Sequence, residues 1–236
     1  MSCRRLPVVA IDGPAGAGKT TVTRGVAERL GYVLLSTGAL YRSVALAAVR
    51  RGVNWDDEAE LGQLARELAQ TEAIRFEAAD SGPRVWLQGE DVTEALRADR
   101  IGAGASQVSA VPAVRAALLD IQRDAGRQGG VVLEGRDIGT AVFPDAEAKF
   151  FLTASVQVRA ERRFLELRER GVAADLAEVT RDVEERDRRD SSRAVAPLRQ
   201  AADAVLIDSS GLDVETVVGR IVTRVRELER RLGEPG

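Results

Sequence analysis

The chain has 236 residues, of which 34 are basic and 37 acidic, with a net charge of −3, no histidine and a single cysteine. The absence of histidine excludes a Ser-His-Asp triad, an imidazole general base and a histidine-ligated zinc site. The near-balanced charge argues against a protein that holds duplex nucleic acid by bulk counterion release. Only Lys19 and Lys149 are lysines, so the other 32 basic residues are arginines.

The sequence carries no sign of a membrane anchor or a secretory signal. No segment approaches the ~20 consecutive apolar residues that a membrane-spanning helix needs. The apolar run over residues 6–11 is too short for a signal peptide and ends at Asp12. One unpaired cysteine, Cys3, agrees with a reducing compartment. We therefore expect a cytoplasmic protein, a monomer, that binds neither nucleic acid nor membrane.

Five short apolar runs alternate with helical periodicity along the chain. The first, over residues 7–12, is followed by Gly13-Pro14 and then by a predicted helix over 20–30, which Gly31 ends as a C-cap. The other apolar runs cover residues 32–35, 131–133, 149–152 and 204–207, and further helices are predicted over 39–51 and 213–232. This alternation predicts an α/β fold with a five-stranded, mainly parallel sheet.

Two segments depart from the alternation. Residues 74–77 and 85–88 alternate apolar and polar side chains around a turn sequence, which predicts an antiparallel hairpin in an inserted subdomain of about residues 55–105. Residues 156–198 are helical in period and dense in charge, with 11 arginines and 10 acidic residues between Arg159 and Arg199. Because these charges nearly cancel, the segment is not a polybasic tail.

A phosphate-binding loop follows the first strand. Gly13, Pro14, Ala15, Gly16, Ala17, Gly18, Lys19 and Thr20 match the pattern G-x-x-x-x-G-K-[ST] between a predicted strand and a predicted helix. Such a loop surrounds triphosphate oxygens with backbone N–H groups, its lysine reaches the β and γ oxygens, and its threonine hydroxyl ligates Mg²⁺. The sequence thus predicts ATP and Mg²⁺ as cofactors, with Thr20 as the metal ligand through ATP and Thr21 as a second hydroxyl.

This motif leaves open what is done with the triphosphate. One class transfers the γ-phosphoryl group to a small acceptor, and another hydrolyses ATP to change shape or to regulate a protein or RNA partner. A GTPase switch would need an Asn-Lys-x-Asp guanine reader, but the only asparagine is Asn54, which precedes Trp55. A motor ATPase uses an apolar strand that ends in an acid, and residues 131–134 supply one, so that alternative stays open.

Arginine in loop contexts favours phosphoryl transfer. An acceptor that is itself a phosphate needs no general base, because its attacking oxygen is already anionic, and catalysis reduces to positioning and charge neutralisation. Arginine suits that task because its planar fork pairs bidentately with phosphate. We expect loop arginines at Arg42, Arg136 and within residues 186–193; Arg136 follows a strand, where ligands of α/β sheets collect.

Several longer segments resemble one family. They are IDGPAGAGKT (11–20), STGALYR (36–42), ASQV (105–108), EGRDIGT (134–140), VFPDA (142–146) and RDRRDSSRAVAPL (186–198). The chain is similar in these segments to the bacterial-type cytidylate kinases of the nucleoside monophosphate kinase family. The resemblance implies transfer of the γ-phosphoryl group of ATP to CMP or dCMP, in pyrimidine nucleotide metabolism. A related kinase for another monophosphate is the second enzyme hypothesis.

The resemblance also implies a P-loop kinase architecture and a set of site residues. One kinase domain would comprise a CORE of about 1–54, 106–155 and 199–236, an NMP-binding insertion of about 55–105, and a helical lid of about 156–198. The implied catalytic residues are Lys19, Arg136, Arg186 and Asp137. The implied substrate-binding residues are Thr37, Tyr41, Arg42, Ser106, Arg115, Arg136, Asp137, Arg186, Asp190 and Arg193, among which Ser106, Arg115, Asp137 and Arg193 would read cytosine.

Two positions differ from the family pattern. Thr37 stands where serine is common, which keeps the hydroxyl and adds a methyl group. Glu134 stands where aspartate is common, so that a Mg²⁺-water role for this acid would need a longer reach. Both differences are expected to shift acceptor affinity without changing the activity.

Overall fold

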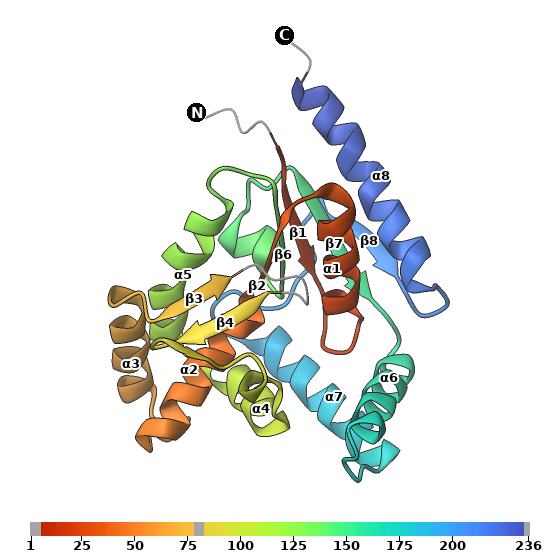
Figure 1. Ribbon diagram of the computed structural model, residues 1–236. Coiled ribbons are helices and arrows are strands. Elements are labelled where there is room, and N and C mark those ends of the chain that lie inside the picture. Colours follow the sequence, from red (N-terminus) through yellow and green to blue (C-terminus); the bar gives the residue numbers. More distant parts are fainter. Residues whose placement is uncertain (1–5, 78–82, 234–236) are drawn as a thin grey trace.

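The predicted α/β architecture is confirmed. The structure is a computed structural model that describes residues 6–77 and 83–233. Its main sheet has five parallel strands in the order β2-β6-β1-β7-β8 (Figure 1). The strands are β1 (Val8–Asp12), β2 (Val33–Ser36), β6 (Val131–Gly135), β7 (Ala148–Thr153) and β8 (Val205–Asp208). Each strand overlaps a predicted apolar run. Cys3, which we interpret as unpaired, lies outside the described residues.

β1 is buried on both sides because helices cover both faces of this sheet. Val9 and Ile11 point into an apolar cluster with α1 (Lys19–Leu30) and α8 (Val214–Gly233). Val8 and Ala10 point to the opposite face, where η2 (Ile138–Val142) packs. This period-2 alternation with apolar residues on both faces is what a central parallel strand requires.

The inserted subdomain packs around one apolar cluster of its own. Its elements are α3 (Glu58–Gln70), β3 (Ile74–Glu77), β4 (Arg84–Leu87), β5 (Glu90–Asp91), η1 (Ala95–Arg97) and α4 (Asp99–Val108). The predicted hairpin is confirmed, with β3 and β4 antiparallel; its turn lies among residues 78–82, outside the described residues, and β5 was not predicted. The cluster also takes side chains from α2 (Thr37–Arg51) and α5 (Pro112–Gly126), so it extends beyond the insertion.

The charged segment forms two helices, α6 (Val156–Glu169) and α7 (Leu176–Ser192), which pack on each other through Ala160, Val179 and Val183. The prediction of helical structure as far as residue 198 was wrong after Ser192. The chain turns there, Ala196 takes a positive φ of 48°, and the N–H of Leu198 returns to the carbonyl oxygen of Asp190 at 2.8 Å. A local fold-back of this kind leaves no trace in the periodicity.

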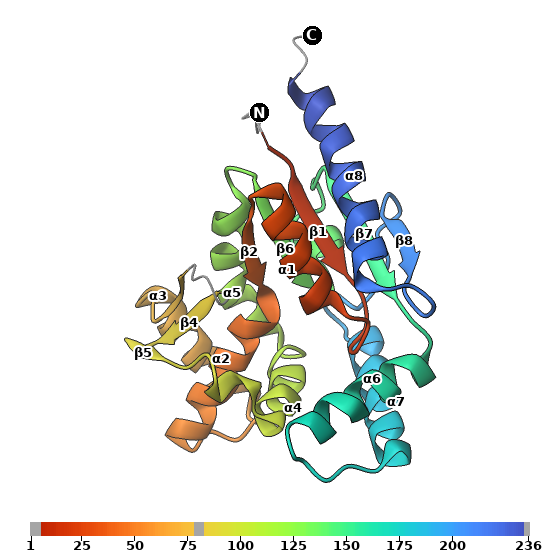
Figure 2. The same ribbon diagram turned by 45° about the vertical axis from the view of Figure 1, so that its right-hand side comes forward.

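Figure 2 shows the insertion and the α6–α7 pair on either side of the space beyond the carboxyl ends of the strands. The two parts touch through ion pairs of Asp99, at the start of α4, with Arg163 of α6 and with Arg170, which directly follows α6. Within the described part of the chain, every helix is too short or too polar to traverse a lipid bilayer.

Candidate active site

The phosphate loop connects β1 to α1 as predicted, and its backbone requires glycine. Gly13 has φ +150°, and a Cβ atom there would lie 1.9 Å from the carbonyl oxygen of Leu152. Gly18 takes the left-handed conformation directly before α1. Lys19 is buried, and its Nζ donates to the carbonyl oxygens of Gly13 at 2.7 Å and Pro14 at 2.6 Å. The loop therefore presents its lysine beside its own first residues.

The threonine hydroxyl of the loop meets the acid at the end of β6. Thr20 Oγ1 donates to Glu134, with distances of 3.2 Å to Oε1 and 3.1 Å to Oε2. Ser36 Oγ donates to Glu134 Oε1 at 2.6 Å, and Thr37 Oγ1 donates to the Glu134 carbonyl oxygen at 2.8 Å. The Glu134 carboxylate therefore extends far enough from β6 to contact the threonine hydroxyl of the phosphate loop. Thr21 is exposed at the start of α1.

Four cations from separate parts of the chain gather beyond the carboxyl ends of β1 and β6. They are Lys19, Arg42, Arg136 and Arg186, which we call the cation cluster. Burial lowers the pKa of Lys19 well below its usual value, and repulsion from Arg136 lowers it further. Burial also lowers the pKa of Arg186 to about 10, with further repulsion from Arg136 and Arg42. Burial lowers the pKa of Arg42 as well.

The acids around the cation cluster leave it incompletely neutralised. Arg136 Nε donates to Asp190 Oδ2 at 2.8 Å, and Asp190 is only 3% exposed. Arg186 Nε is buried and has no hydrogen-bond partner among the described residues. Like charges repel strongly when they are held together out of water, so this arrangement suits a ligand with several negative charges.

The predicted loop context is wrong for Arg42, and within residues 186–193 it holds only for Arg193, which follows the last residue of α7. Arg42 lies on α2, which begins at Thr37, and Arg186 lies on α7, which continues to Ser192. Only Arg136 follows a strand directly. Arg42 and Arg186 nevertheless lie near Arg136. Arg42 is close to the carboxyl ends of the strands because α2 starts directly where β2 ends.

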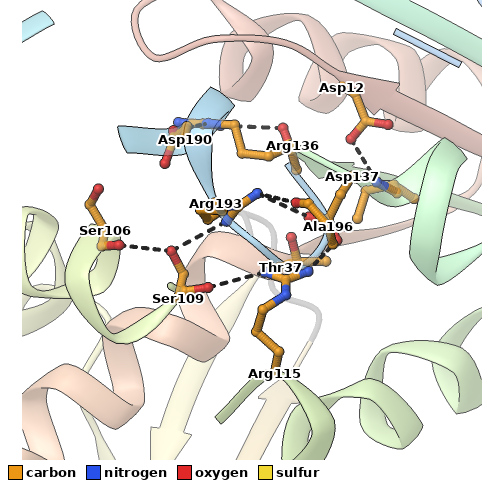
Figure 3. Close-up of polar contacts among 12 residues, drawn as sticks. Asp12, Thr37, Ser106, Ser109, Arg115, Arg136, Asp137, Asp190, Arg193 and Ala196 are labelled. Carbon is orange, nitrogen blue, oxygen red and sulfur yellow. Dashed lines mark hydrogen bonds and ion pairs between the residues drawn. The ribbon is translucent and has the colours of Figure 1, made fainter. Parts of the chain in front are cut away.

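A second group of side chains surrounds Asp137, next to the cation cluster (Figure 3). Arg115 of α5 forms a buried ion pair with Asp137 Oδ2, and Arg193 Nη2 lies 3.8 Å from Oδ1. Burial raises the pKa of Asp137, while the two arginines oppose that rise. The Tyr41 ring lies beneath Arg115, with 5.7 Å from the guanidinium carbon to the ring centroid.

Serines from α4 and the turn after it complete this second group. Arg115 Nη1 donates to the Ser109 carbonyl oxygen at 3.3 Å, and Arg193 Nη1 donates to Ser109 Oγ at 3.5 Å. Ser109 Oγ in turn donates to the carbonyl oxygen of Ser106 at 3.0 Å. Ser106 Oγ is buried without a hydrogen-bond partner in the described chain. A buried hydroxyl of this kind is available to a ligand.

The predicted site residues therefore form two adjoining groups, joined by the consecutive residues Arg136 and Asp137. Three contacting residues were absent from the predicted set: Asp12, Ser36 and Ser109. Asp12 ends a predicted strand and Ser36 directly follows one, which is a signal that could have included them. Ser109 lies in a turn and carries no such signal.

Asp12 lies behind these groups rather than in them. Its Oδ1 accepts the N–H of Ile138 and its Oδ2 accepts the N–H of Gly139, each at 2.8 Å. Burial raises the pKa of Asp12 to about 6, with repulsion from Asp137 adding to the rise and the attraction of Lys19 opposing it. The carboxylate is thus ionised at neutral pH.

A phosphate loop at the carboxyl edge of a parallel sheet, with an arginine from the end of a neighbouring strand and another from a separate helix near its lysine, defines a P-loop phosphotransferase. The family model described as cytidylate kinase matches residues 9–227. The chain belongs to the cytidylate kinase family. It is 52% identical over 227 residues to the cytidylate kinase of Geobacter sulfurreducens, and 50% identical over 228 residues to that of Pseudomonas aeruginosa PAO1. Each alignment covers 96% of both proteins.

The fold is also found among solved structures. An uncharacterized protein from Eubacterium ventriosum superimposes with a TM-score of 0.53 at 14% identity, covering 94% of this chain and 98% of that one. At that identity the likeness concerns the fold alone.

Proposed function

We propose that the protein transfers the γ-phosphoryl group of ATP to CMP or dCMP, giving ADP and CDP or dCDP, in pyrimidine nucleotide metabolism. Membership of the cytidylate kinase family over nearly the whole chain supports the acceptor, as do the names of its relatives. The observation that carries the proposal is the cation cluster, in which Arg136 and Arg186 lie near the lysine of the phosphate loop and Arg42 lies near both of these arginines.

The transfer needs no general base from the protein. An oxygen of the acceptor phosphate attacks the γ-phosphorus of ATP, and the bond from that phosphorus to the bridging oxygen of ADP breaks. Negative charge on the transferring group is neutralised by Lys19, Arg136 and Arg186, which is the main task of a phosphoryl-transfer site. The absence of histidine is therefore no obstacle.

In our proposal the cation cluster and the residues beside it bind the phosphate part of the acceptor, and the group around Asp137 binds its base. Thr37, Tyr41 and Arg42, with Arg136, hold the acceptor phosphate and its surroundings, while Arg186 and Asp190 reach the sugar and the transferring phosphates. The proposed cytosine readers are Ser106, Arg115, Asp137 and Arg193. The exocyclic amine of cytosine donates to Asp137, whereas uracil presents a carbonyl oxygen there. A buried acid that faces a carbonyl oxygen in place of a donor costs on the order of 1–3 kcal/mol, which disfavours UMP.

The residues at the end of β6 fit a magnesium ion. Mg²⁺ in kinase sites is bound by one or two oxygen side chains together with substrate phosphates. Thr20 and Glu134 supply such oxygens, within 3.2 Å of each other. Among the described residues no group of three acidic, histidine or cysteine side chains could hold a metal, so ATP would supply the remaining ligands. When bound, the ion neutralises phosphate charge; Thr20 and Glu134 orient it.

The division into CORE, NMP-binding insertion (about 55–105) and lid (about 156–198) is likewise part of the proposal. The apolar cluster of α6–α7 supports the lid, because a part with its own core can move relative to the sheet. The insertion shares its apolar cluster with α2 and α5, so these helices would move together with it. We also propose a cytoplasmic monomer, for which size-exclusion chromatography with light scattering is the test of subunit number.

A coupled assay that follows ADP release tests the function. With ATP and Mg²⁺ present, CMP and dCMP are expected to raise ADP release far above the rate without acceptor, and UMP and AMP to raise it much less. Rapid ADP release that CMP does not change would instead support a regulatory P-loop ATPase. A larger response to UMP or AMP would support a kinase for another monophosphate.

A further inference from the structure

Asp12 is a buried carboxylate to which neither the phosphate loop motif nor the substrate groups assign a role. It ends β1, is 4% exposed, and accepts two backbone N–H groups from a different part of the chain, Ile138 and Gly139 (Figure 3). Both contacts are 2.8 Å long, and each uses a different carboxylate oxygen. Asp12 therefore connects the strand that carries the phosphate loop to the segment after Asp137.

The segment needs this connection. η2 is a single helical turn over Ile138–Val142, and the first N–H groups of a helix have no partner within it. Asp12 supplies acceptors for two of them from outside the helix. A carboxylate has only acceptors, whereas an amide side chain has one acceptor oxygen and one NH₂ group that would face an N–H. The site is thus specific for a carboxyl group over an amide.

The position of η2 fixes the position of Asp137. The carbonyl oxygen of Asp137 accepts the N–H groups of Ala141 at 2.9 Å and Val142 at 3.2 Å, so Asp137 is part of the same turn. The far end of the segment is held separately, since Lys149 Nζ donates to the Pro144 carbonyl oxygen at 2.5 Å. Arg123 also holds the far end, by donating to the carbonyl oxygens of Ala141 at 3.3 Å and Val142 at 3.2 Å. Arg115 donates to the Asp137 carboxylate itself, and among the described residues Asp12 is the side chain that fixes the backbone directly after Asp137.

We propose that Asp12 is a positioning residue for base recognition: by holding the N–H groups of Ile138 and Gly139 it keeps the Asp137 carboxylate where it selects cytosine over uracil. This inference rests on the proposed function. It differs from a role in the phosphate loop alone, because a loop role would alter ATP binding and leave the choice of acceptor base unchanged.

The test compares kcat/KM for CMP and for UMP in the wild type, Asp12→Asn and Asp57→Asn, together with the Kd of ATP. Asp57 is the matched control: it also accepts a backbone N–H, that of Glu60 at 3.0 Å, but at the start of α3 away from both groups. We expect Asp12→Asn to reduce the preference for CMP about tenfold or more, with the Kd of ATP changed less than about threefold. Asp57→Asn should change neither.

If Asp12→Asn does not fold, Asp12→Glu replaces it, because it keeps two acceptor oxygens on a longer arm and is expected to reduce the same preference. A wild-type enzyme that prefers CMP, with an Asp12 variant that keeps this preference, overturns the inference and leaves the proposed function intact. A folded wild-type protein that does not phosphorylate CMP refutes the proposed function, and the inference with it.

Discussion

The charged side chain of Arg186 is predicted to lower the free energy of unfolding of the protein, although the proposed reaction needs it. Burial and the repulsion of Arg136 and Arg42 lower its pKa from 12.5 to about 10. A fall of this size corresponds to roughly 3 kcal/mol, by which the folded state disfavours the charged form. The penalty is fully present below pH 10 and is lost only as pH rises through the lowered pKa. At neutral pH the folded protein therefore bears all of it.

Replacement of Arg186 by methionine keeps an unbranched apolar stem and removes the charge. We expect a gain of about 1–2 kcal/mol after some loss of polar contact, which for a chain of this length raises the Tm by about 3–6 °C. The kcat for CMP should fall about 10³-fold or more, because a cation on the transferring group is lost. ATP should raise the Tm of the wild type more than that of the variant.

Thermal unfolding followed by circular dichroism, with the coupled assay, measures both effects. Arg181→Met is the control, because Arg181 lies on the same helix, is exposed, and has only a 3.9 Å ion pair with Glu178. It should change neither Tm nor kcat. A Tm for Arg186→Met at or below that of the wild type would refute the prediction that the buried charge of Arg186 destabilises the fold. Near-full turnover by the same variant would refute the catalytic role of Arg186.

Four further predictions follow from single contacts. Asp137→Asn should reduce the ratio of kcat/KM for CMP to that for UMP about 10–100-fold, measured with both acceptors, since an amide also donates to the uracil carbonyl. Chelation of Mg²⁺ by EDTA should abolish turnover, and Glu134→Gln should raise the Mg²⁺ concentration needed for half-maximal rate; an unchanged requirement would argue against the metal role. Because burial raises the pKa of Asp12 to about 6 from 3.8, its stabilising effect is present below pH 4 and lost as pH rises through 6. Urea titrations should show the stability of the wild type relative to Asp12→Asn falling by roughly 2 kcal/mol from pH 4 to pH 7, and a flat difference would contradict this. Gly104→Val should cost about 1–3 kcal/mol in the same titrations, because a Cβ atom there lies 2.4 Å from the Trp55 ring; an unchanged midpoint would show that the ring can move.

The local elements could be predicted because their causes are local. Short apolar runs predicted all five strands of the main sheet, and Gly31 ends α1 in the left-handed conformation that its prediction as a C-cap requires. The hairpin of β3 and β4 followed from alternation. The two-residue strand β5 was missed because so short a strand has no periodicity. Residues 193–198 were wrongly predicted as helical because the chain folds back on the end of α7 through hydrogen bonds that hydrophobic periodicity does not reveal.

The sequence by itself determined the phosphate loop, its lysine and the family, because these depend on residue types at fixed spacing. It also showed that only a few of the 32 arginines lie in segments that could bind phosphate. Only the tertiary structure decided that Lys19, Arg42, Arg136 and Arg186 share one site and that their charges repel. It alone connected Asp12 to the turn after Asp137, across 126 residues of chain. Such long-range pairs depend on which carboxyl ends of parallel strands become neighbours, and strand order is a property of the whole fold.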